Sequence, residues 1–191
     1  MGEWLTKQTC YDIKSLVTSN VCCQLMSLVN NIAVVSCKVL TTILKDTQFN
    51  ANLLNLEITE SILLDNDQGV MNWLQDLRAT GAQLAIDDFG TDYSSLSYLR
   101  RFPINTIKID RSFISDLTAS EDSAVLVKAI VSMAASLNLK VIAEGVENKV
   151  QLKSLNDLGG QYVQGYFYAK PLPIEALQIW VNEHICRFCC K

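Results

Sequence analysis

The sequence predicts an α/β protein whose parallel sheet closes into a TIM-like (β/α)8-type barrel, and two observations support this fold class. Short apolar stretches alternate along the chain with longer helical patterns, as in proteins built from βαβ units. Each apolar stretch also carries an ionisable or amide side chain on one face, near its C-terminal end. An open sheet covered by helices on both faces would bury these groups, whereas a barrel gathers them at its C-terminal mouth.

The elements follow one another from about residue 41. The apolar stretches predict strands at 53–59, 82–87, 105–110, 139–145 and 161–167. The patterns with helical spacing predict helices at about 62–79, 94–101, 121–137, 147–158 and 173–184. Gly81, Pro103 and the pair Gly159 and Gly160 fall between these elements, where residues that break regular structure belong. The chain is short for a complete barrel, so we expect an incomplete one.

The period of two along each strand separates candidate functional side chains from apolar ones. In the first of these strands, Glu57 lies on the face opposite to Leu56 and Ile58. The same alternation in all the strands gives an inward-facing set of Glu57, Asp87, Lys108, Glu144 and Gln164, with Asp88 at the start of the following loop. Glu60 is left outside this set, because we expect it to be exposed or simply to begin the next helix.

Four carboxylates at one mouth would repel one another unless a multiply charged cation lay among them. Oxygen ligands favour Mg²⁺ or Mn²⁺ over zinc, and His184 is the one histidine of the chain. Two such ions about 3.5–4 Å apart share ligands in sites that promote phosphoryl displacement. Lys108 would add positive charge near a phosphate or orient the attacking water. The alternative is a structural ion pair of Lys108 with Asp110 or a neighbouring carboxylate.

Composition limits the class of protein and its partners. The 191 residues are 49% hydrophobic, and 16 basic against 20 acidic side chains give a net charge of −4. The chain therefore has enough apolar residues for a sizeable core. It lacks a basic tract, which argues against DNA or RNA as a partner. The seven cysteines lie toward the two ends, with none between Cys37 and Cys186, which favours a cytosolic core over a disulfide-stabilised secreted one.

Five motifs carry a resemblance to a known family. They read LEITES at 56–61, DDFGTDYSSL at 87–96, IKIDRSFI at 107–114, VIAEGVE at 141–147 and VQGYFYAKPLP at 163–173. In this order and at these separations they resemble the EAL-domain family of bacterial cyclic-di-GMP phosphodiesterases. The resemblance runs almost continuously from about residue 41 to residue 181.

The resemblance implies a TIM-like barrel that uses two Mg²⁺ or Mn²⁺ ions to hydrolyse cyclic-di-GMP to linear pGpG. The residues that it implies are Glu57, Asp87 and Asp88 as metal ligands, Lys108 and Glu144 as catalytic residues, and Gln164 as a substrate-binding residue. Family members commonly sit behind sensory or GGDEF-type domains, and their dimers involve the loop after Asp88. We therefore expect cyclic-di-GMP as ligand, a cytoplasmic location, a homodimer through that loop and, in a full-length parent, such a domain or a membrane tether.

The first strand of the family pattern is missing from this chain. In the family that strand carries the Glu-Ala-Leu signature, whose glutamate is a metal ligand. Residues 1–16 resemble the helix that follows it, and Glu175-Ala176-Leu177 is a chance match at the wrong end of the domain. We expect a poorly matching N-terminal segment at 1–40, an EAL-type barrel portion at 41–181 and a Cys-rich tail at 182–191.

Residues 17–37 read like foreign sequence between two matching parts. The family's metal-binding asparagine belongs in this region, but Asn30 and Asn31 stand too close to Glu57 and lack the usual neighbours. Residues 15–37 carry no charge, yet their many polar side chains argue against a membrane span. We therefore expect the metal site to be incomplete.

Three functions are compatible with this sequence. The first is metal-dependent hydrolysis of cyclic-di-GMP, with weak or no activity in the truncated chain. The second is a non-catalytic module that binds cyclic-di-GMP or another protein. The third is an unproductive remnant of a longer phosphodiesterase, with unpaired sheet edges that invite association. Whether this chain is an enzyme stays open at the level of sequence.

Overall fold

A computed structural model describes residues 2–16, 25–27, 36–64, 68–91 and 99–188. Its centre is a single parallel sheet in which each strand pairs with the next one along the chain. The strands are β1 (Leu25–Ser27), β2 (Leu54–Thr59), β3 (Gln83–Phe89), β4 (Thr106–Ile109), β5 (Lys140–Glu144) and β6 (Tyr162–Gln164). This sequential parallel order confirms the predicted α/β fold class. Within the described residues β1 and β6 are the two ends of the sheet and do not pair with each other.

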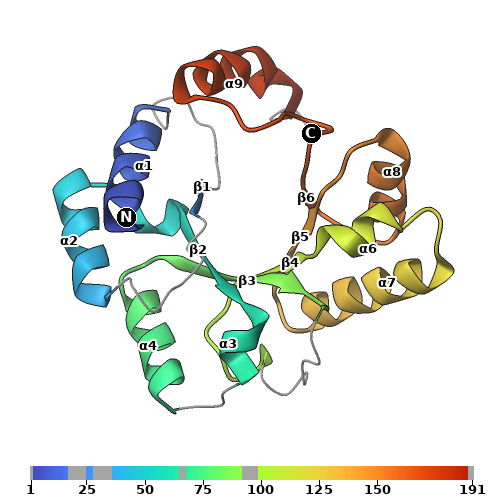
Figure 1. Ribbon diagram of the computed structural model, residues 1–191, viewed down its shortest axis with the longest axis horizontal. Helices are drawn as coiled ribbons and strands as arrows, with labels where there is room; N and C mark the ends of the chain where they lie inside the picture. Colours follow the sequence, from blue (N-terminus) through green and yellow to red (C-terminus); the bar gives the residue numbers. More distant parts are fainter. Residues whose placement is uncertain (1, 17–24, 28–35, 65–67, 92–98, 189–191) are drawn as a thin grey trace.

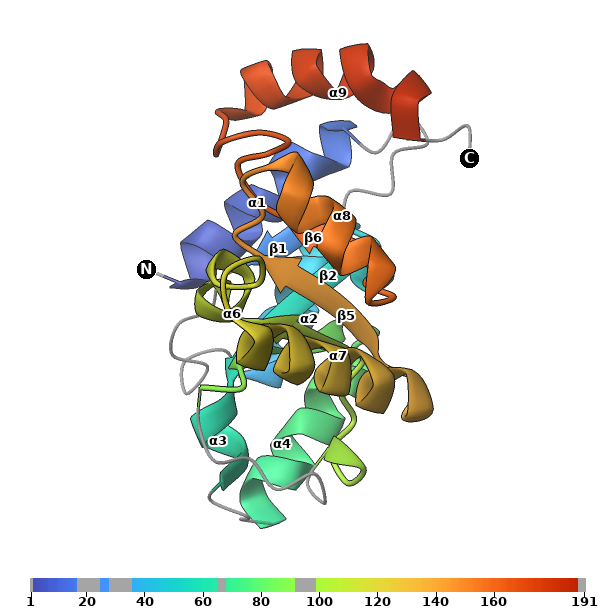
Figure 2. The same ribbon diagram turned by 90° about the vertical axis from the view of Figure 1, so that its right-hand side faces the viewer.

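Helices lie around the outside of the curved sheet (Figure 1). They are α1 (Gly2–Leu16), α2 (Cys37–Thr47), α3 (Glu60–Leu64), α4 (Gln68–Ala79), α6 (Arg111–Ser115), α7 (Glu121–Ser136), α8 (Lys149–Asp157) and α9 (Ile174–Phe188), with a short 3₁₀ helix η2 at Ala51–Leu53. The strands form an arc that is open on the side of α9 (Figure 1), and α9 lies at one end of the molecule in the turned view (Figure 2). No helix among the described residues is both long and apolar enough to span a membrane.

All five strands predicted from the sequence are present, within two or three residues at each end. The main differences lie in the N-terminal part of the chain. Strand β1 falls inside the stretch read as foreign sequence, and α2 begins before the point where regular patterns become visible. Most of the helix expected at 94–101 and most of the 17–37 stretch lie outside the described residues.

The hydrophobic core lies between the outer face of the sheet and the helices. Leu56 of β2 and Ile107 of β4 point outward and pack in one buried cluster with Leu74 of α4 and Val127 of α7. Each aliphatic side chain that is fully buried in this way stabilises the fold by about 1.5–3 kcal/mol. The inward-facing Ile142 is also buried but lies apart from that cluster. The sheet therefore has an apolar outer face and a separate inner face that is free to carry functional groups.

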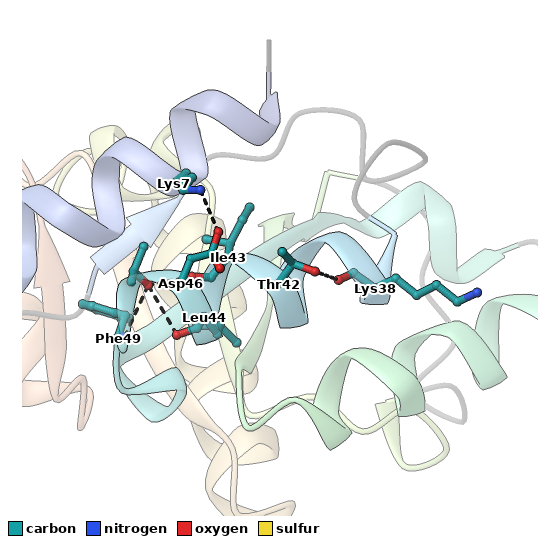
Figure 3. Close-up of polar contacts among 8 residues, drawn as sticks. Lys7, Lys38, Thr42, Ile43, Leu44, Asp46 and Phe49 are labelled. Atoms are coloured by element: carbon teal, nitrogen blue, oxygen red, sulfur yellow. Dashed lines mark hydrogen bonds and ion pairs between the residues drawn. The ribbon is translucent and has the colours of Figure 1, made fainter.

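Helices α1 and α2 pack together at the N-terminal end. The Lys7 ammonium pairs with the Asp46 carboxylate at 2.8 Å, as Figure 3 shows. Lys14 donates to the Thr47 carbonyl at 3.0 Å. The Thr47 hydroxyl, in turn, donates to the Ile43 carbonyl and accepts from the Phe49 amide where the chain leaves α2. These contacts fix the direction in which the chain enters η2 and β2.

Candidate functional site

The inner face of the sheet carries a buried lysine surrounded by carboxylates. The Lys108 ammonium on β4 lies 2.9 Å from Glu57 Oε1 on β2, 2.7 Å from Asp87 Oδ1 on β3 and 2.6 Å from Glu144 Oε1 on β5. Lys108 is only 2% exposed. Four neighbouring strands thus contribute one charged side chain each, as the alternation in the sequence predicts. Lys108 pairs with these three carboxylates, while Asp110 caps helix α6 through the Ser112 amide.

A bulge in β3 accounts for the two adjacent aspartates. Ile86 pairs with Ile107 and Phe89 with Ile109, so that Asp87 and Asp88 together stand opposite one residue of β4. Such a bulge re-aims side chains that would otherwise alternate between the two faces of the sheet. Asp88 has a φ of 52°, a left-handed conformation that aspartate tolerates better than most residues. The sequence places Asp88 in a loop, whereas the strand continues to Phe89.

The bulge brings Asp88 into a second group of acidic side chains. One carboxylate oxygen from each of Asp87, Asp88 and Glu144 lies within 4.8 Å of the other two. Among the described residues this is the one group of three metal-binding side chains at such spacing. Oxygen-only donors at this separation fit a hard divalent cation such as Mg²⁺ or Mn²⁺. Asp88 is exposed, so this group opens to solvent.

Burial and mutual repulsion shift the protonation of this cluster. Burial raises the pKa of Glu57 to about 7, against the opposing influence of Lys108. Burial also raises the pKa of Glu144, and burial together with the Asp87 charge raises that of Asp88. Burial alone would lower the pKa of Lys108, but its hydrogen bonds to Asp87, Glu144 and Glu57 outweigh this and raise it. Lys108 therefore keeps its positive charge in the metal-free protein.

Glu60 is a residue of the site that the sequence did not reveal. It begins α3, as expected, but it is 2% exposed, which contradicts the expectation of an exposed side chain. Its Oε2 accepts a hydrogen bond from the Gly90 amide at 3.1 Å. Glu60 therefore connects the end of β2 with the turn that follows Asp87 and Asp88. The period-two pattern misses it because Glu60 lies just beyond the strand.

Asn55 is a second residue that the sequence did not single out. It shares the inner face of β2 with Glu57 and is buried. Neither atom of its side-chain amide has a hydrogen-bond partner among the described residues, and the same holds for Oε2 of Glu57. Buried polar groups without partners are rare in proteins because each costs about 1–3 kcal/mol. The inner face therefore keeps hydrogen-bonding capacity beside the Lys108 cluster.

A cavity of about 610 Å³ adjoins Glu144. Gln164 pairs in register with Glu144 on the neighbouring strand and lines this cavity, together with Arg111 and Glu147. Arg111 and Glu147 form an ion pair of 2.7 Å at its rim. Tyr166, Lys170 and Trp180 extend the wall toward α9, with the Lys170 ammonium 5.7 Å from the centre of the Tyr166 ring. The cavity thus offers aromatic faces and cations next to the carboxylates.

The segment between β5 and α8 is held closely against the edge of this cavity. Gly145 has a φ of 73°, and a Cβ there would overlap the Arg111 side chain. At Gly165, a Cβ would overlap the backbone of Val146. Val146 also donates to the Gln164 carbonyl at 3.1 Å and accepts from the Phe167 amide at 2.9 Å. Glycine at both positions therefore permits the close packing that places Glu144 and Gln164 side by side.

These motifs and this geometry agree with a family comparison. The EAL domain matches residues 1–171, which is most of the chain. The chain belongs to the EAL-domain family. The family resemblance of the sequence motifs is thereby confirmed, and the match also includes residues 1–40, which the sequence predicted to be a poorly matching segment.

Curated relatives include two cyclic-di-GMP phosphodiesterases. NbdA of Pseudomonas aeruginosa is 39% identical over 196 residues, which covers 96% of this chain and 24% of NbdA. PdeR of Escherichia coli is 42% identical over 148 residues, which covers 78% of this chain and 22% of PdeR. The chain thus spans less than a quarter of the length of either relative.

Solved EAL-domain structures have the same fold. The phosphodiesterase MucR of Pseudomonas aeruginosa, in complex with cyclic-di-GMP, has a TM-score of 0.80 and 34% identity, covering 92% of this chain and 73% of that one. The EAL domain of Mycobacterium smegmatis DcpA has a TM-score of 0.84 and 29% identity over 96% of this chain and 84% of its own. These neighbours confirm the TIM-like character of the EAL fold in this chain.

Metal ions and the nucleotide occur together in a further relative. The structure of BlrP1 from Klebsiella pneumoniae is a complex with manganese and cyclic-di-GMP. It has a TM-score of 0.65 and 32% identity, covering 69% of this chain and 34% of that one. In the EAL domain described here, the carboxylates of Asp87, Asp88 and Glu144 provide a donor set that suits such an ion.

Proposed function

We propose that this EAL domain carries the cyclic-di-GMP site of a metal-dependent phosphodiesterase that yields linear pGpG, and that this chain by itself has very weak activity or none. The observation that carries the proposal is the Lys108 ammonium between the carboxylates of Glu57, Asp87 and Glu144, with Asp88 brought alongside by the bulge. This arrangement lies beside a cavity of about 610 Å³. The EAL-domain relatives that are cyclic-di-GMP phosphodiesterases support it at the level of the family.

The proposed division of roles follows from burial and access. Divalent ions held by Glu57, Asp87 and Asp88 would neutralise charge on the phosphodiester and activate water. Lys108 would stabilise negative charge that develops on the phosphate, because its ammonium is held in place by three partners. Glu144 would hold or accept a proton, which its raised pKa favours. Gln164 would bind the substrate at the wall of the cavity.

A non-catalytic cyclic-di-GMP-binding or protein-interaction module is the second candidate function. It is favoured by the buried ion pair of Glu57 with Lys108, because this pair leaves only some of the carboxylates of the site open to a metal ion. In that case the cavity would still bind the nucleotide through its aromatic faces and cations. Binding without turnover would then be the observable behaviour.

Incubation of the purified chain with cyclic-di-GMP and Mn²⁺, followed by chromatography for pGpG, tests the proposal. We expect saturable binding of cyclic-di-GMP by calorimetry and slow or undetectable product formation. Any slow turnover should disappear in Asp87→Asn, while Asp157→Asn, an exposed carboxylate on α8, serves as control. Absence of both binding and turnover in a folded chain would contradict the proposal. Robust turnover that Asp87→Asn abolishes would contradict the expectation of weak activity and exclude the binding module.

Assembly and cellular context remain proposals. The homodimer was expected through the loop after Asp88, and residues 92–98 of that loop lie outside the described residues. MucR, a bifunctional diguanylate cyclase and phosphodiesterase, supports the idea that a longer parent combines this domain with a GGDEF-type one. We propose a cytoplasmic site of action because the expected nucleotide is intracellular.

A further inference from the structure

Two charged side chains at the rim of the cavity have no role in the proposed reaction. Arg111 begins α6 just after β4, and Glu147 lies in the segment between β5 and α8. Nη2 of Arg111 lies 2.7 Å from Oε1 of Glu147. Both side chains stay open to solvent, with exposed fractions of 61% for Arg111 and 44% for Glu147. The pair is therefore accessible to a ligand that enters the cavity.

The surrounding chain holds this pair in place. Asp110 caps α6 by accepting a hydrogen bond from a backbone amide at 2.9 Å, which fixes the start of the helix where Arg111 stands. The buried Gln151 side chain of α8 accepts from the Glu147 amide at 2.8 Å. The Arg111 side chain crosses Gly145, where a Cβ would overlap it. The two side chains are thus preorganised, which lowers the entropy lost when a ligand binds.

The pair offers hydrogen-bond donors and acceptors side by side. A guanidinium has five N–H groups and a carboxylate has two oxygens, and the ion pair uses one nitrogen of Arg111 and one oxygen of Glu147. The other N–H groups of Arg111 can donate in a planar, bidentate manner, and Oε2 of Glu147 can accept. A flat ligand with acceptors next to donors along its edge fits such a pair.

Guanine is a base with this pattern. Its O6 and N7 accept hydrogen bonds, and arginine commonly donates to both of them. Its N1–H and its N2 amino group lie next to O6 along the edge and donate. Adenine carries an amino group where guanine has O6. Adenine would therefore place a donor against the Arg111 guanidinium.

The cavity connects this pair with the carboxylates around Lys108. Glu144 lines the cavity and lies 2.6 Å from the Lys108 ammonium. A phosphodiester beside that cluster therefore leaves its nucleoside to extend along the cavity toward Arg111 and Glu147. Tyr166, which is 56% exposed, lines the same cavity and offers a ring on which a base can stack.

We propose that Arg111 and Glu147 recognise a guanine base of cyclic-di-GMP and select it over adenine. The guanidinium of Arg111 donates to O6 and N7, and the carboxylate of Glu147 accepts from N1–H. The inference rests on the proposed function, because it concerns the ligand of the same cavity. It assigns the choice of base to two residues outside the cluster around Lys108.

Calorimetric titration of the full chain with cyclic-di-GMP and with cyclic-di-AMP, both in the presence of Mn²⁺, tests this inference. The two ligands share their backbone and differ in the base. We expect cyclic-di-GMP to bind more tightly by roughly 5–150-fold, the discrimination that one bidentate contact with a base edge gives. Equal affinities, or a preference for cyclic-di-AMP, would overturn the inference without the need for any variant.

The variant Arg111→Lys separates base recognition from general attraction, because lysine keeps the charge but loses the planar set of donors. It should lose most of the preference for cyclic-di-GMP, with little change in the affinity for cyclic-di-AMP. Glu147→Gln, which replaces an acceptor oxygen by an amide donor, should also reduce the preference.

The matched control is Arg100→Lys, which changes an exposed arginine that does not line the cavity and should keep the preference of the parent chain. Circular dichroism of each variant shows whether it is folded. An equal loss of affinity for both dinucleotides in Arg111→Lys would indicate a phosphate contact or a structural role and would overturn the inference.

Titration with GMP and AMP distinguishes failure of this inference from failure of the proposed function. A chain that prefers GMP, loses this preference in Arg111→Lys and does not bind cyclic-di-GMP would support the inference and contradict the function. Equal binding of both cyclic dinucleotides together with formation of pGpG would do the reverse. A folded chain that binds none of the four ligands would contradict both.

Discussion

A lysine that is 2% exposed is stable in its charged form only because of the groups around it. Lys108 has three carboxylate partners at 2.6–2.9 Å, and these same carboxylates would repel one another without it. In the metal-free protein the Lys108 ammonium thus offsets part of the repulsion among these carboxylates, as a bound metal ion would. The side chain is a structural element of the site as well as a candidate catalytic one.

The substitution Lys108→Met tests this role at the level of one residue. Methionine keeps much of the volume but leaves the buried carboxylates of Glu57, Asp87 and Glu144 uncompensated. We expect a loss of about 3–5 kcal/mol in the free energy of unfolding without metal, the range found when a buried ion pair loses one partner. Urea denaturation measures it, and excess Mn²⁺ should narrow the difference. Lys153→Met, an exposed position on α8, is the control, and equal stabilities of the two variants would refute the structural role.

Glu57 gives a prediction about pH. Its pKa is raised to about 7 in the folded chain from an ordinary value of 4.5, so the folded state binds the proton more tightly than the unfolded state does. This contribution to stability is fully present below pH 4.5 and is lost as the pH rises toward about 7. Glu57→Gln cannot titrate. In metal-free urea denaturation, the stability of the parent chain relative to Glu57→Gln should therefore fall between these pH values. A constant or rising difference would refute it.

The sequence was sufficient for most single residues of the site. Glu57, Asp87, Lys108 and Glu144 stand at alternate strand positions, and the inner face of a parallel barrel necessarily brings such positions together. Glu60 could not be found in this way. Its contact is with the Gly90 amide, a backbone group from another segment, and no pattern of side chains reveals where a distant amide points.

At the scale of elements, short segments decide the geometry of the site. The bulge of β3 turns two adjacent aspartates toward one group, and the chain after β5 packs directly on the chain after β6. The five strands with clear alternation were predicted. Strand β1 was not, because Leu25 and Met26 are both apolar and the strand shows no alternation of polar and apolar side chains. The bulge was not predicted either, since it depends on pairing between strands and not on the order of side chains.

The packing of the Val146 segment on β6 yields a prediction for Gly165. A Cβ at this position would lie 2.1 Å from the Val146 carbonyl oxygen, a backbone atom that cannot rotate away as the end of a flexible side chain could. We expect Gly165→Ala to lower the free energy of unfolding by more than about 3 kcal/mol, beyond the usual cost of overpacking. The loss should be accompanied by weaker binding of cyclic-di-GMP at the cavity that Gly165 lines.

Gly159→Ala is the matched control for this change. Gly159 has a positive φ, of 87°, which Gly165 does not have, but a Cβ on Gly159 would only reach ordinary contact at 3.6 Å. Backbone strain alone should then cost about 1–2 kcal/mol. Thermal denaturation of both variants compares the two effects, and a Gly159→Ala loss equal to that of Gly165→Ala would refute the prediction that close packing at Gly165 costs more than backbone strain.

At the scale of the whole molecule, the described sheet has two ends. Its end strands β1 and β6 do not pair with each other, and Tyr162 on β6 is 42% exposed. A strand at the end of a sheet offers unpaired amides and carbonyls to other chains. Lys108 and its three carboxylate partners lie on β2 to β5, between the two end strands. Association through the ends is therefore expected to leave the contacts of Lys108 intact.

We accordingly expect the chain to self-associate as its concentration rises. Sedimentation velocity should show the mean mass increasing with concentration, and Tyr162→Lys should reduce this increase, because charge on an edge strand opposes pairing with another strand. Val150→Lys, which changes an exposed apolar residue of α8, controls for general surface hydrophobicity and should leave the association unchanged. A chain that stays monomeric at all concentrations would refute the prediction, as would association that Val150→Lys prevents and Tyr162→Lys does not. Gln164 of β6 also lines the cavity. Cyclic-di-GMP bound in the cavity would therefore compete with a second chain for β6 and should weaken the association.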